Sequence, residues 1–436
     1  MVYKEISEMA DRLQEKLSAC RRDLHRHGET GWLEMRTSSL IAARLKKMGY
    51  EVLTGDQVCR PEARMGLPSK ELFDQHYQWA LEHGADKEYL ERAKDGHTGV
   101  IGILCCGEGP TVALRFDMDA LNVFEDGGPE HLPAREGFCS VTEGTMHACG
   151  HDGHMTIGLG TAELLMQFKD RLSGTIKLIF QPAEEGVRGA RSIVEMGHLD
   201  DVDYVMASHL SASADGSCYV CPGIAKTFAT TKLDACFKGK AVHAGVCPQN
   251  GKNALMAAAT AVLNIQAIPR HENGSSRVNV GTLHAGTGRN VVCDRAKMEI
   301  EVRGETTEIN DYMEASVRRI LQGCADMYEC GLEITTMGSA AAIQCTEAFT
   351  ERIARVCREK LHMDVRPSEG MGASEDFAYM TKRVIELGKN ACFTGIHIPC
   401  RASFHNRSFD FDERALALGV KFYTGVVWDL LGDGED

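Results

Sequence analysis

Hydrophobic side chains recur at helical spacing in two stretches of the first fifty residues, at 6–17 and at 40–48. This period places them on one face of a helix, so helices are expected there. Residues 57–95 are polar, contain two prolines and become helical in pattern from about residue 70. Because this segment is long for a simple connection, we expect it to be an inserted helical segment over a core.

Buried-strand patterns and helical patterns alternate after residue 98. The runs at 111–116, 175–181 and 202–207 have the composition of buried strands, and helix-like stretches lie between them. This alternation predicts an α/β domain with a mostly parallel sheet. In such sheets ligands bind outside the carboxyl ends of the strands. The side chains that follow these three runs are therefore expected at one site, and they are Asp117, Asp119, Glu184, Glu185 and His209.

The pattern changes near residue 222. Residues 226–240 alternate as an antiparallel strand does, and strands at 276–283, 297–304 and 331–337 follow, with helices at 253–268 and 310–328. The order is β-α-β-β-α-β. We predict a catalytic domain made of residues 1–222 and 339–436, interrupted by an inserted domain at 223–338.

Composition excludes several classes of protein. The 436 residues carry a net charge of −14, which disfavours nucleic acid and anionic membranes as partners. No run of eighteen apolar residues occurs, and the N-terminal stretch does not have the pattern of a signal peptide. The seventeen cysteines are scattered through apolar runs, where a free thiol packs as a small core residue. We expect a cytoplasmic protein.

The segment 146–154 concentrates potential metal ligands. It reads Met-His-Ala-Cys-Gly-His-Asp-Gly-His and places His147, Cys149, His151 and His154 within eight residues. Imidazole and thiolate are ligands that zinc and neighbouring metals prefer. The segment cannot close a metal site alone, so ligands from elsewhere in the chain are required.

The segment 146–154 belongs to a larger set of motifs that resembles a known family. The other members of the set are Arg115-Phe-Asp-Met-Asp-Ala-Leu, Phe180-Gln-Pro-Ala-Glu-Glu-Gly, His243-Ala-Gly, Gly288-Arg-Asn-Val-Val, Ser374-Glu-Asp and His405-Asn-Arg-Ser-Phe-Asp. The family is that of the dinuclear metallopeptidases and amidohydrolases, which includes carboxypeptidase G, aminoacylase and the indole-acetyl-amino-acid hydrolases. The resemblance implies a zinc-peptidase-like α/β catalytic domain and an inserted ferredoxin-like α+β domain for dimerisation.

The resemblance also implies roles for single residues. The ligands of two divalent ions, manganese or zinc, would be Cys149, His151, Glu185, His209 and His405. Glu184 would be the general base, which agrees with a physical argument. Since neighbouring residues point in different directions, one carboxylate can bind metal while the other faces the attacking water.

Other roles concern the substrate and the surroundings of the metals. By resemblance, His243 polarises the substrate carbonyl, and Asn290 and Arg303 bind a substrate carboxylate. Asp117 would hold the ligating imidazoles in place without binding a metal ion itself. His154 is favoured as a helix N-terminal residue over a ligand, whereas Asp119, His147 and Glu375 stay open between a structural and a functional role.

The implied reaction is hydrolysis of an amide next to a carboxylate-bearing amino acid, with p-aminobenzoyl-glutamate as the preferred substrate. A broader N-acyl-amino-acid amidohydrolase is the alternative enzyme. A non-catalytic subunit of a hetero-oligomer is an alternative of another class, although the presence of Glu184 argues against it. The chain would act as a homodimer, or as a heteromer with a related second subunit, through the inserted domain.

Overall fold

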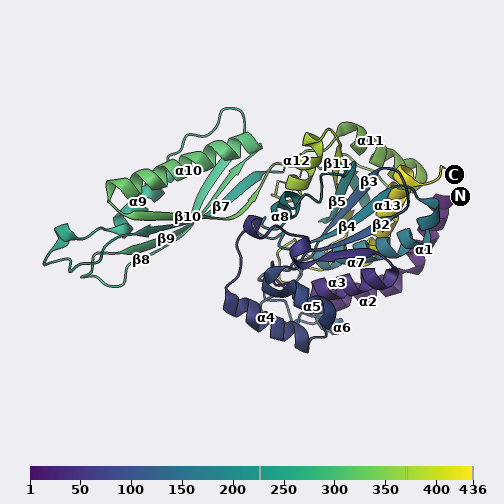
Figure 1. Cartoon of the computed structure of the whole chain (residues 1–436), viewed down its shortest axis with the longest axis horizontal. Helices are drawn as coiled ribbons and strands as arrows, with labels where there is room; N and C mark the ends of the chain where they lie inside the picture. Colours follow the sequence, from purple (N-terminus) through teal and green to yellow (C-terminus); the bar gives the residue numbers. More distant parts are fainter. Residues whose placement is uncertain (225–226, 369, 371, 435–436) are drawn as a thin grey trace. The chain divides into compact units, whose positions relative to one another are not determined.

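The computed structural model describes residues 1–224, 227–368, 370 and 372–434, and the chain forms two compact units (Figure 1). The first unit comprises Met1–Ala225, Ile343–Gly370 and Asp376–Asp436, and the second comprises Lys226–Ala342 and Met371–Glu375. The unit boundaries lie a few residues beyond the predicted ones at 222 and 338. Among the described helices, none has the length and hydrophobicity needed to cross a membrane.

The first unit contains a seven-stranded sheet in the order β1-β2-β4-β3-β5-β11-β6. Its central strands β4, β3, β5 and β11 run parallel, and the outer strands are antiparallel to their neighbours. The strands are β1 (Glu51–Thr54), β2 (Val100–Cys105), β3 (Thr111–Asp117), β4 (Thr175–Gln181), β5 (Tyr204–Ala212), β6 (Tyr219–Pro222) and β11 (Asn390–Ile398).

Helices surround this sheet, and α7 is buried along most of its length because other helices and β3 pack against it. Gly158 on α7 permits the close approach to the sheet, since a Cβ there would lie 2.7 Å from the Phe116 ring. The helices are α1 (Val2–Arg12), α2 (Gln14–Arg26), α3 (Met35–Met48), α4 (Lys70–Glu82), α5 (Lys87–Leu90), α6 (Leu132–Glu136), α7 (His151–Gln167), α8 (Ala190–Glu195), α11 (Glu347–Arg355), α12 (Ala378–Glu386) and α13 (Arg414–Leu431).

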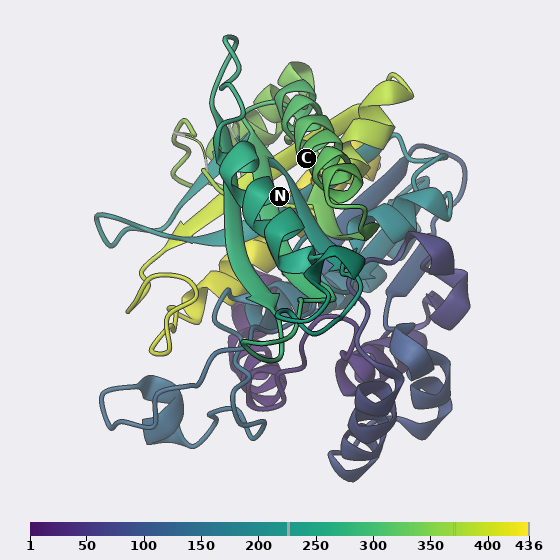
Figure 2. The same cartoon turned by 90° about the vertical axis from the view of Figure 1, so that its left-hand side faces the viewer.

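The second unit is a four-stranded antiparallel sheet in the order β10-β7-β9-β8. Figure 2 shows its two helices side by side over the sheet, and their apolar residues share one core with the strands. Its elements are β7 (Ala229–Lys238), α9 (Ala254–Gln266), β8 (Ser276–Ala285), β9 (Arg295–Gly304), α10 (Thr307–Met327) and β10 (Gly331–Ala340). The fold class expected from the sequence, α/β with an inserted ferredoxin-like domain, is confirmed.

Three elements differ from the sequence-based expectation. The strand β11 was not predicted, yet it lies in the sheet between β5 and β6. The helix expected over 346–361 ends at Arg355 and continues as a π-helix, Val356–Lys360. The strand expected from Lys226 begins at Ala229, and Lys226 itself lies outside the described residues.

Candidate metal centre

Three parallel strands deliver acidic and imidazole side chains to one edge of the first unit's sheet. β3 ends at Asp117, β4 ends at Gln181 and leads into Glu184 and Glu185, and β5 carries His209. Because β3 lies between β4 and β5 and is parallel to both, the carboxyl ends of the three strands meet at the same edge.

The five side chains that the resemblance implied as ligands lie together. The ligand atoms of Cys149, His151 and His209 are within 4.8 Å of one another, and so are those of Cys149, Glu185 and His405. Cys149 Sγ is 3.6 Å from His209 Nε2, and His405 Nε2 is 3.6 Å from Glu185 Oε1. Since Cys149 belongs to both groups, it connects them.

Backbone carbonyls orient the two buried imidazoles. His151 Nδ1–H donates to the Asp119 carbonyl at 2.7 Å, and His209 Nδ1–H donates to the Leu210 carbonyl at 2.5 Å. A carbonyl only accepts, so each ring keeps its Nε2 lone pair for another partner. Within the described part of the chain, His151 Nε2 and Glu185 Oε1 are buried without a hydrogen-bond partner. A buried polar atom without a partner destabilises the fold unless a ligand binds to it. A divalent cation is a suitable ligand for both the His151 nitrogen and the Glu185 oxygen.

Burial also controls the protonation of these donors. It raises the pKa of the Cys149 thiol, raises the pKa of the Glu185 carboxyl to about 7, and lowers the pKa of His209 to about 3. Each of these three shifts favours the uncharged form, whereas at His151 the nearby Asp117, Asp119 and Cys149 outweigh burial and raise the pKa well above its usual value. A cation would favour thiolate, carboxylate and neutral imidazole instead, because these are the forms that bind metals.

Comparison with known proteins identifies the family. The model of peptidase family M20/M25/M40 matches residues 113–429. The chain belongs to this family. It is therefore a metal-dependent hydrolase of amide bonds, and the cluster of donors is a candidate site for divalent cations.

Several M20 relatives are similar over almost the whole chain. Indole-3-acetyl-aspartic acid hydrolase of Enterobacter agglomerans is 43% identical over 95% of this chain and 96% of its own length. A protein of Escherichia coli that is named as one subunit of p-aminobenzoyl-glutamate hydrolase is 42% identical with the same coverage. N-acetylcysteine deacetylase of Bacillus subtilis is 29% identical over 95% of this chain and 97% of its own length.

Solved M20 structures agree with the fold. The aminobenzoyl-glutamate utilization protein of Klebsiella pneumoniae superposes with a TM-score of 0.84 at 36% identity, covering 97% of this chain and 98% of that one. A dinuclear metal-binding M20 peptidase of Bacillus subtilis superposes with a TM-score of 0.66 at 26% identity, covering 96% and 99%. The dinuclear character of that peptidase is consistent with the two overlapping groups of donors.

Two buried carboxylates hold the turn that carries Glu184 and Glu185. Asp119 accepts hydrogen bonds from both backbone amides, with Oδ1 2.9 Å from the nitrogen of Glu184 and Oδ2 2.9 Å from that of Glu185. Ala183, just before them, has a left-handed φ of 52°, and its N–H donates to Glu34 Oε1 at 2.8 Å. Asp119 was an open candidate in the sequence. Glu34 was missed, because it lies 149 residues from the turn that it supports.

Asp117 and His154 form a second layer beside the donors. Asp117 Oδ1 accepts from His154 Nδ1 at 2.5 Å, and Oδ2 accepts from Arg115 at 2.6 Å. Burial raises the pKa of Asp117, but the electrostatic interactions with His151, His154 and Arg115 and the hydrogen bond from His154 outweigh it and hold this pKa well below its usual range. His154 Nε2 accepts from the Leu210 N–H at 2.9 Å, so both nitrogens of His154 are already engaged.

Three predicted residues lie in the second unit. His243 forms an isolated antiparallel bridge with Val291, and the Ala244 N–H donates to the Asn290 carbonyl at 2.9 Å, so the loops of His243 and Asn290 are neighbours. Arg303 lies on β9, where its Nε is 3.1 Å from a Glu301 oxygen.

The two remaining open candidates, His147 and Glu375, are both buried. Neither ring nitrogen of His147 has a hydrogen-bond partner in the described chain, and burial lowers the pKa of this ring to about 4.

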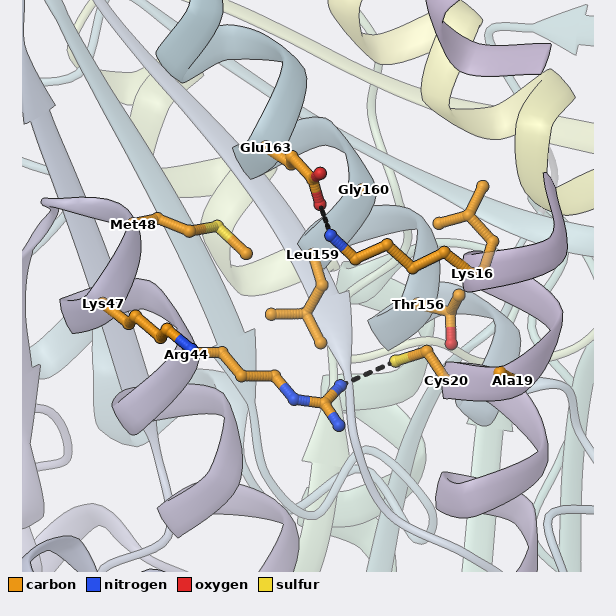
Figure 3. Close-up of a pocket in the computed structure, with 11 residues that line it drawn as sticks. Lys16, Ala19, Cys20, Arg44, Lys47, Met48, Thr156, Leu159, Gly160 and Glu163 are labelled. Atoms are coloured by element: carbon orange, nitrogen blue, oxygen red, sulfur yellow. Dashed lines mark hydrogen bonds and ion pairs between the residues drawn. The ribbon is translucent and has the colours of Figure 1, made fainter. Parts of the chain in front are cut away.

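A separate cavity of about 630 Å³ lies among α2, α3 and α7 (Figure 3). Arg44 donates to Cys20 Sγ at 2.8 Å, and Lys16 pairs with Glu163 at 2.5 Å across it. It contains none of the predicted site residues, so this cavity is not part of the candidate metal centre.

Proposed function

We propose that this chain hydrolyses p-aminobenzoyl-glutamate to p-aminobenzoate and glutamate. The observation that carries the proposal is a complete set of metal donors at the strand ends with Glu184 directly beside it. The substrate is supported by the similarity to the Escherichia coli protein named for hydrolysis of p-aminobenzoyl-glutamate. Indole-3-acetyl-aspartic acid hydrolase, at nearly the same identity, is likewise named for a conjugate of an acidic amino acid.

The proposed ligands of two divalent ions, manganese or zinc, are Cys149, His151, Glu185, His209 and His405. When bound, such a pair of cations lowers the pKa of a water molecule and polarises the carbonyl of the scissile amide. The mixed sulfur, nitrogen and oxygen donors suit either metal, so availability would decide between them.

Glu184 is the proposed general base. It takes the proton of the attacking water as the new C–O bond forms, and it returns this proton to the amide nitrogen as the C–N bond breaks. Asp119 fixes the backbone amides of Glu184 and Glu185, so the base and the ligand beside it keep a constant spacing. Asp117 supports the imidazoles from outside the site.

The second unit is proposed to recognise the substrate. His243 would polarise the scissile carbonyl, and Asn290 and Arg303 would bind the carboxylate of the amino acid. The planar guanidinium of Arg303 suits this task because it can pair with both oxygens of a carboxylate.

The second unit is also the proposed contact with another chain, in a homodimer or in a heteromer with a related second subunit. β8 is an edge strand of its sheet, and unpaired edges readily accept another strand. α9, which packs against β8, exposes Leu255, Met256 and Leu263 to 40%, 46% and 74%. A large apolar side chain at such exposure is what a partner would cover.

A broader N-acyl-amino-acid amidohydrolase is the second candidate, and the similarity to N-acetylcysteine deacetylase favours it. A non-catalytic subunit is less well supported because Glu184 and all five donors are present. We place the protein in the cytoplasm as a proposal, since its seventeen cysteines are free thiols.

Hydrolysis by the purified full-length chain tests these proposals. The chain is stripped of metal, refilled with manganese or zinc, and assayed with p-aminobenzoyl-glutamate, N-acetylcysteine and hippurate, with Glu184→Ala as the control. We expect turnover of p-aminobenzoyl-glutamate that requires metal and Glu184. Turnover of the other substrates alone would favour the broader enzyme, and activity only after addition of a second subunit would favour the heteromer.

A further inference from the structure

Two arginines lie opposite each other on one face of the second unit's sheet. In the register of β8 against β9, Arg277 is the partner of Arg303. Val302 is buried in the core with the helices, so its neighbour Arg303 faces the other side, because strand side chains alternate. Like charges at opposed positions of a sheet are destabilising. An additional negative charge close to the two arginines would offset this repulsion.

Among the described residues, an acidic side chain neutralises only one of these two guanidinium charges. Glu301 lies 3.1 Å from Arg303 and 2.8 Å from Lys232, so its carboxylate is already shared between two cations. Within the described chain, the guanidinium of Arg277 has no ion pair and no hydrogen bond. It lies over the Phe228 ring at 5.2 Å. Stacking on an aromatic ring holds a guanidinium in place, and the N–H groups at the edge of the guanidinium can still donate hydrogen bonds to a ligand.

These side chains surround a cavity of about 520 Å³, which we call the arginine cavity. It is lined by Arg270, Arg277 and Arg303 together with Asn279 and Glu301, among others. Three guanidinium groups against one carboxylate give it an excess of two positive charges. Its volume suits a small molecule rather than a single ion, and Asn279 adds an uncharged amide.

We infer that the arginine cavity binds the side-chain carboxylate of an acidic amino acid, with Arg277 as the residue that determines this specificity. The inference rests on the proposed function, in which Arg303 and Asn290 bind the α-carboxylate. An aspartate or glutamate conjugate carries a second carboxylate, and Arg277 is an unpaired cation opposite Arg303 that can receive it. Conjugates of neutral amino acids would leave Arg277 without a partner.

The test compares p-aminobenzoyl-glutamate with p-aminobenzoyl-glutamine, which has the same shape but no side-chain charge. The metal-loaded full-length chain should prefer the glutamate conjugate. In Arg277→Gln, kcat/KM for this conjugate should fall about 10- to 100-fold, mainly through KM, because a hydrogen bond to a charged group is lost. Turnover of the glutamine conjugate should change less than about 2-fold. Arg277→Lys keeps the positive charge but loses the paired N–H donors of the guanidinium. Its kcat/KM for the glutamate conjugate should therefore lie between those of the wild type and Arg277→Gln.

Arg295→Gln is the matched control. Arg295 is exposed on the same strand as Arg303, and since it lies eight residues away it is on the same face, but it does not line the cavity. Arg295→Gln should leave kcat/KM for both conjugates unchanged. Equal losses for both conjugates in Arg277→Gln, or an unchanged preference for glutamate, would overturn the inference.

A binding measurement separates this inference from the proposed function. If the wild-type chain hydrolyses neither conjugate, the proposed reaction fails, but calorimetry with free glutamate and free glutamine still tests the cavity. Tighter binding of glutamate that is lost in Arg277→Gln supports the inference. Equal binding of the two amino acids, or no binding of either, overturns it.

Discussion

His154 Nε2 accepts a 2.9 Å hydrogen bond from the backbone N–H of Leu210. Leu210 directly follows His209, and the other nitrogen of His154 is held by Asp117 at the end of β3. His154 therefore connects Asp117 at the end of β3 to the residue that follows the candidate ligand His209 on β5. We therefore expect His154 to be a positioning residue, although it lies in the same short motif as two of the proposed ligands.

Replacing His154 by Ala should weaken metal binding about 10- to 100-fold, as the loss of supporting groups around metal ligands does. The Leu210 N–H and the Asp117 carboxylate would both lose a buried partner, so His209 would no longer be held in register. Metal retained per chain during dialysis against increasing chelator measures this effect. His198→Ala, which removes a half-buried ring bonded to the Gln57 carbonyl, should retain wild-type affinity. Equal retention by the two variants would contradict the positioning role.

Asp119→Asn should impair catalysis more than substrate binding. The new amide places an NH₂ group against one of the backbone N–H groups of Glu184 and Glu185, so one of them loses its acceptor. We expect a loss of about 1–3 kcal/mol of stability and a fall in kcat of about 100-fold from the displaced base. Urea unfolding and steady-state kinetics measure the two effects. Asp126→Asn, in a loop where Asp126 accepts from Gly128 and Ser408, is the control. A wild-type kcat in Asp119→Asn would refute this account.

Where candidate site residues follow the ends of strands, the sequence predicted that these side chains lie close together. Alternating strand and helix patterns predicted a parallel sheet, and a parallel sheet brings Glu185 and His209 together. β11 is as buried as β3 and β4, but its sequence Asn-Ala-Cys-Phe-Thr-Gly-Ile-His-Ile is not a continuous apolar run, and Gly395 weakens the strand pattern. The opposition of Arg277 and Arg303 depends on strand register, and the contact of Glu34 with the Ala183 amide depends on tertiary packing, which a local pattern does not contain.

The proposed contact between chains predicts that Leu263→Glu yields monomers. Leu263 is 74% exposed on α9, and a carboxylate there could not be buried against a partner without a large desolvation penalty. Sedimentation velocity over a range of concentrations measures the change. Met327→Glu, at the 67% exposed end of α10, should leave the assembly intact. Dissociation by both substitutions, or by neither, would assign the contact to another surface.

Glu34 should make the stability of the metal-free chain depend on pH. Burial, followed by the nearby charge of Asp119, raises the pKa of Glu34 from 4.5 to about 8. A folded-state pKa above the unfolded value means that the folded chain holds its proton longer, so stability is lost as pH rises. The contribution of Glu34 is full below pH 4.5 and disappears as pH rises through about 8.

Glu34→Gln tests this dependence directly. Glutamine resembles the protonated acid, since its oxygen can still accept from Ala183 and its NH₂ can donate to the Thr98 hydroxyl, which now bonds to Glu34. Melting temperatures of the metal-free proteins between pH 5 and pH 8 should therefore fall less steeply in the variant than in the wild type. Parallel curves would mean that Glu34 does not keep its proton in the folded chain, and that its contact with the turn before Glu184 is made by the carboxylate.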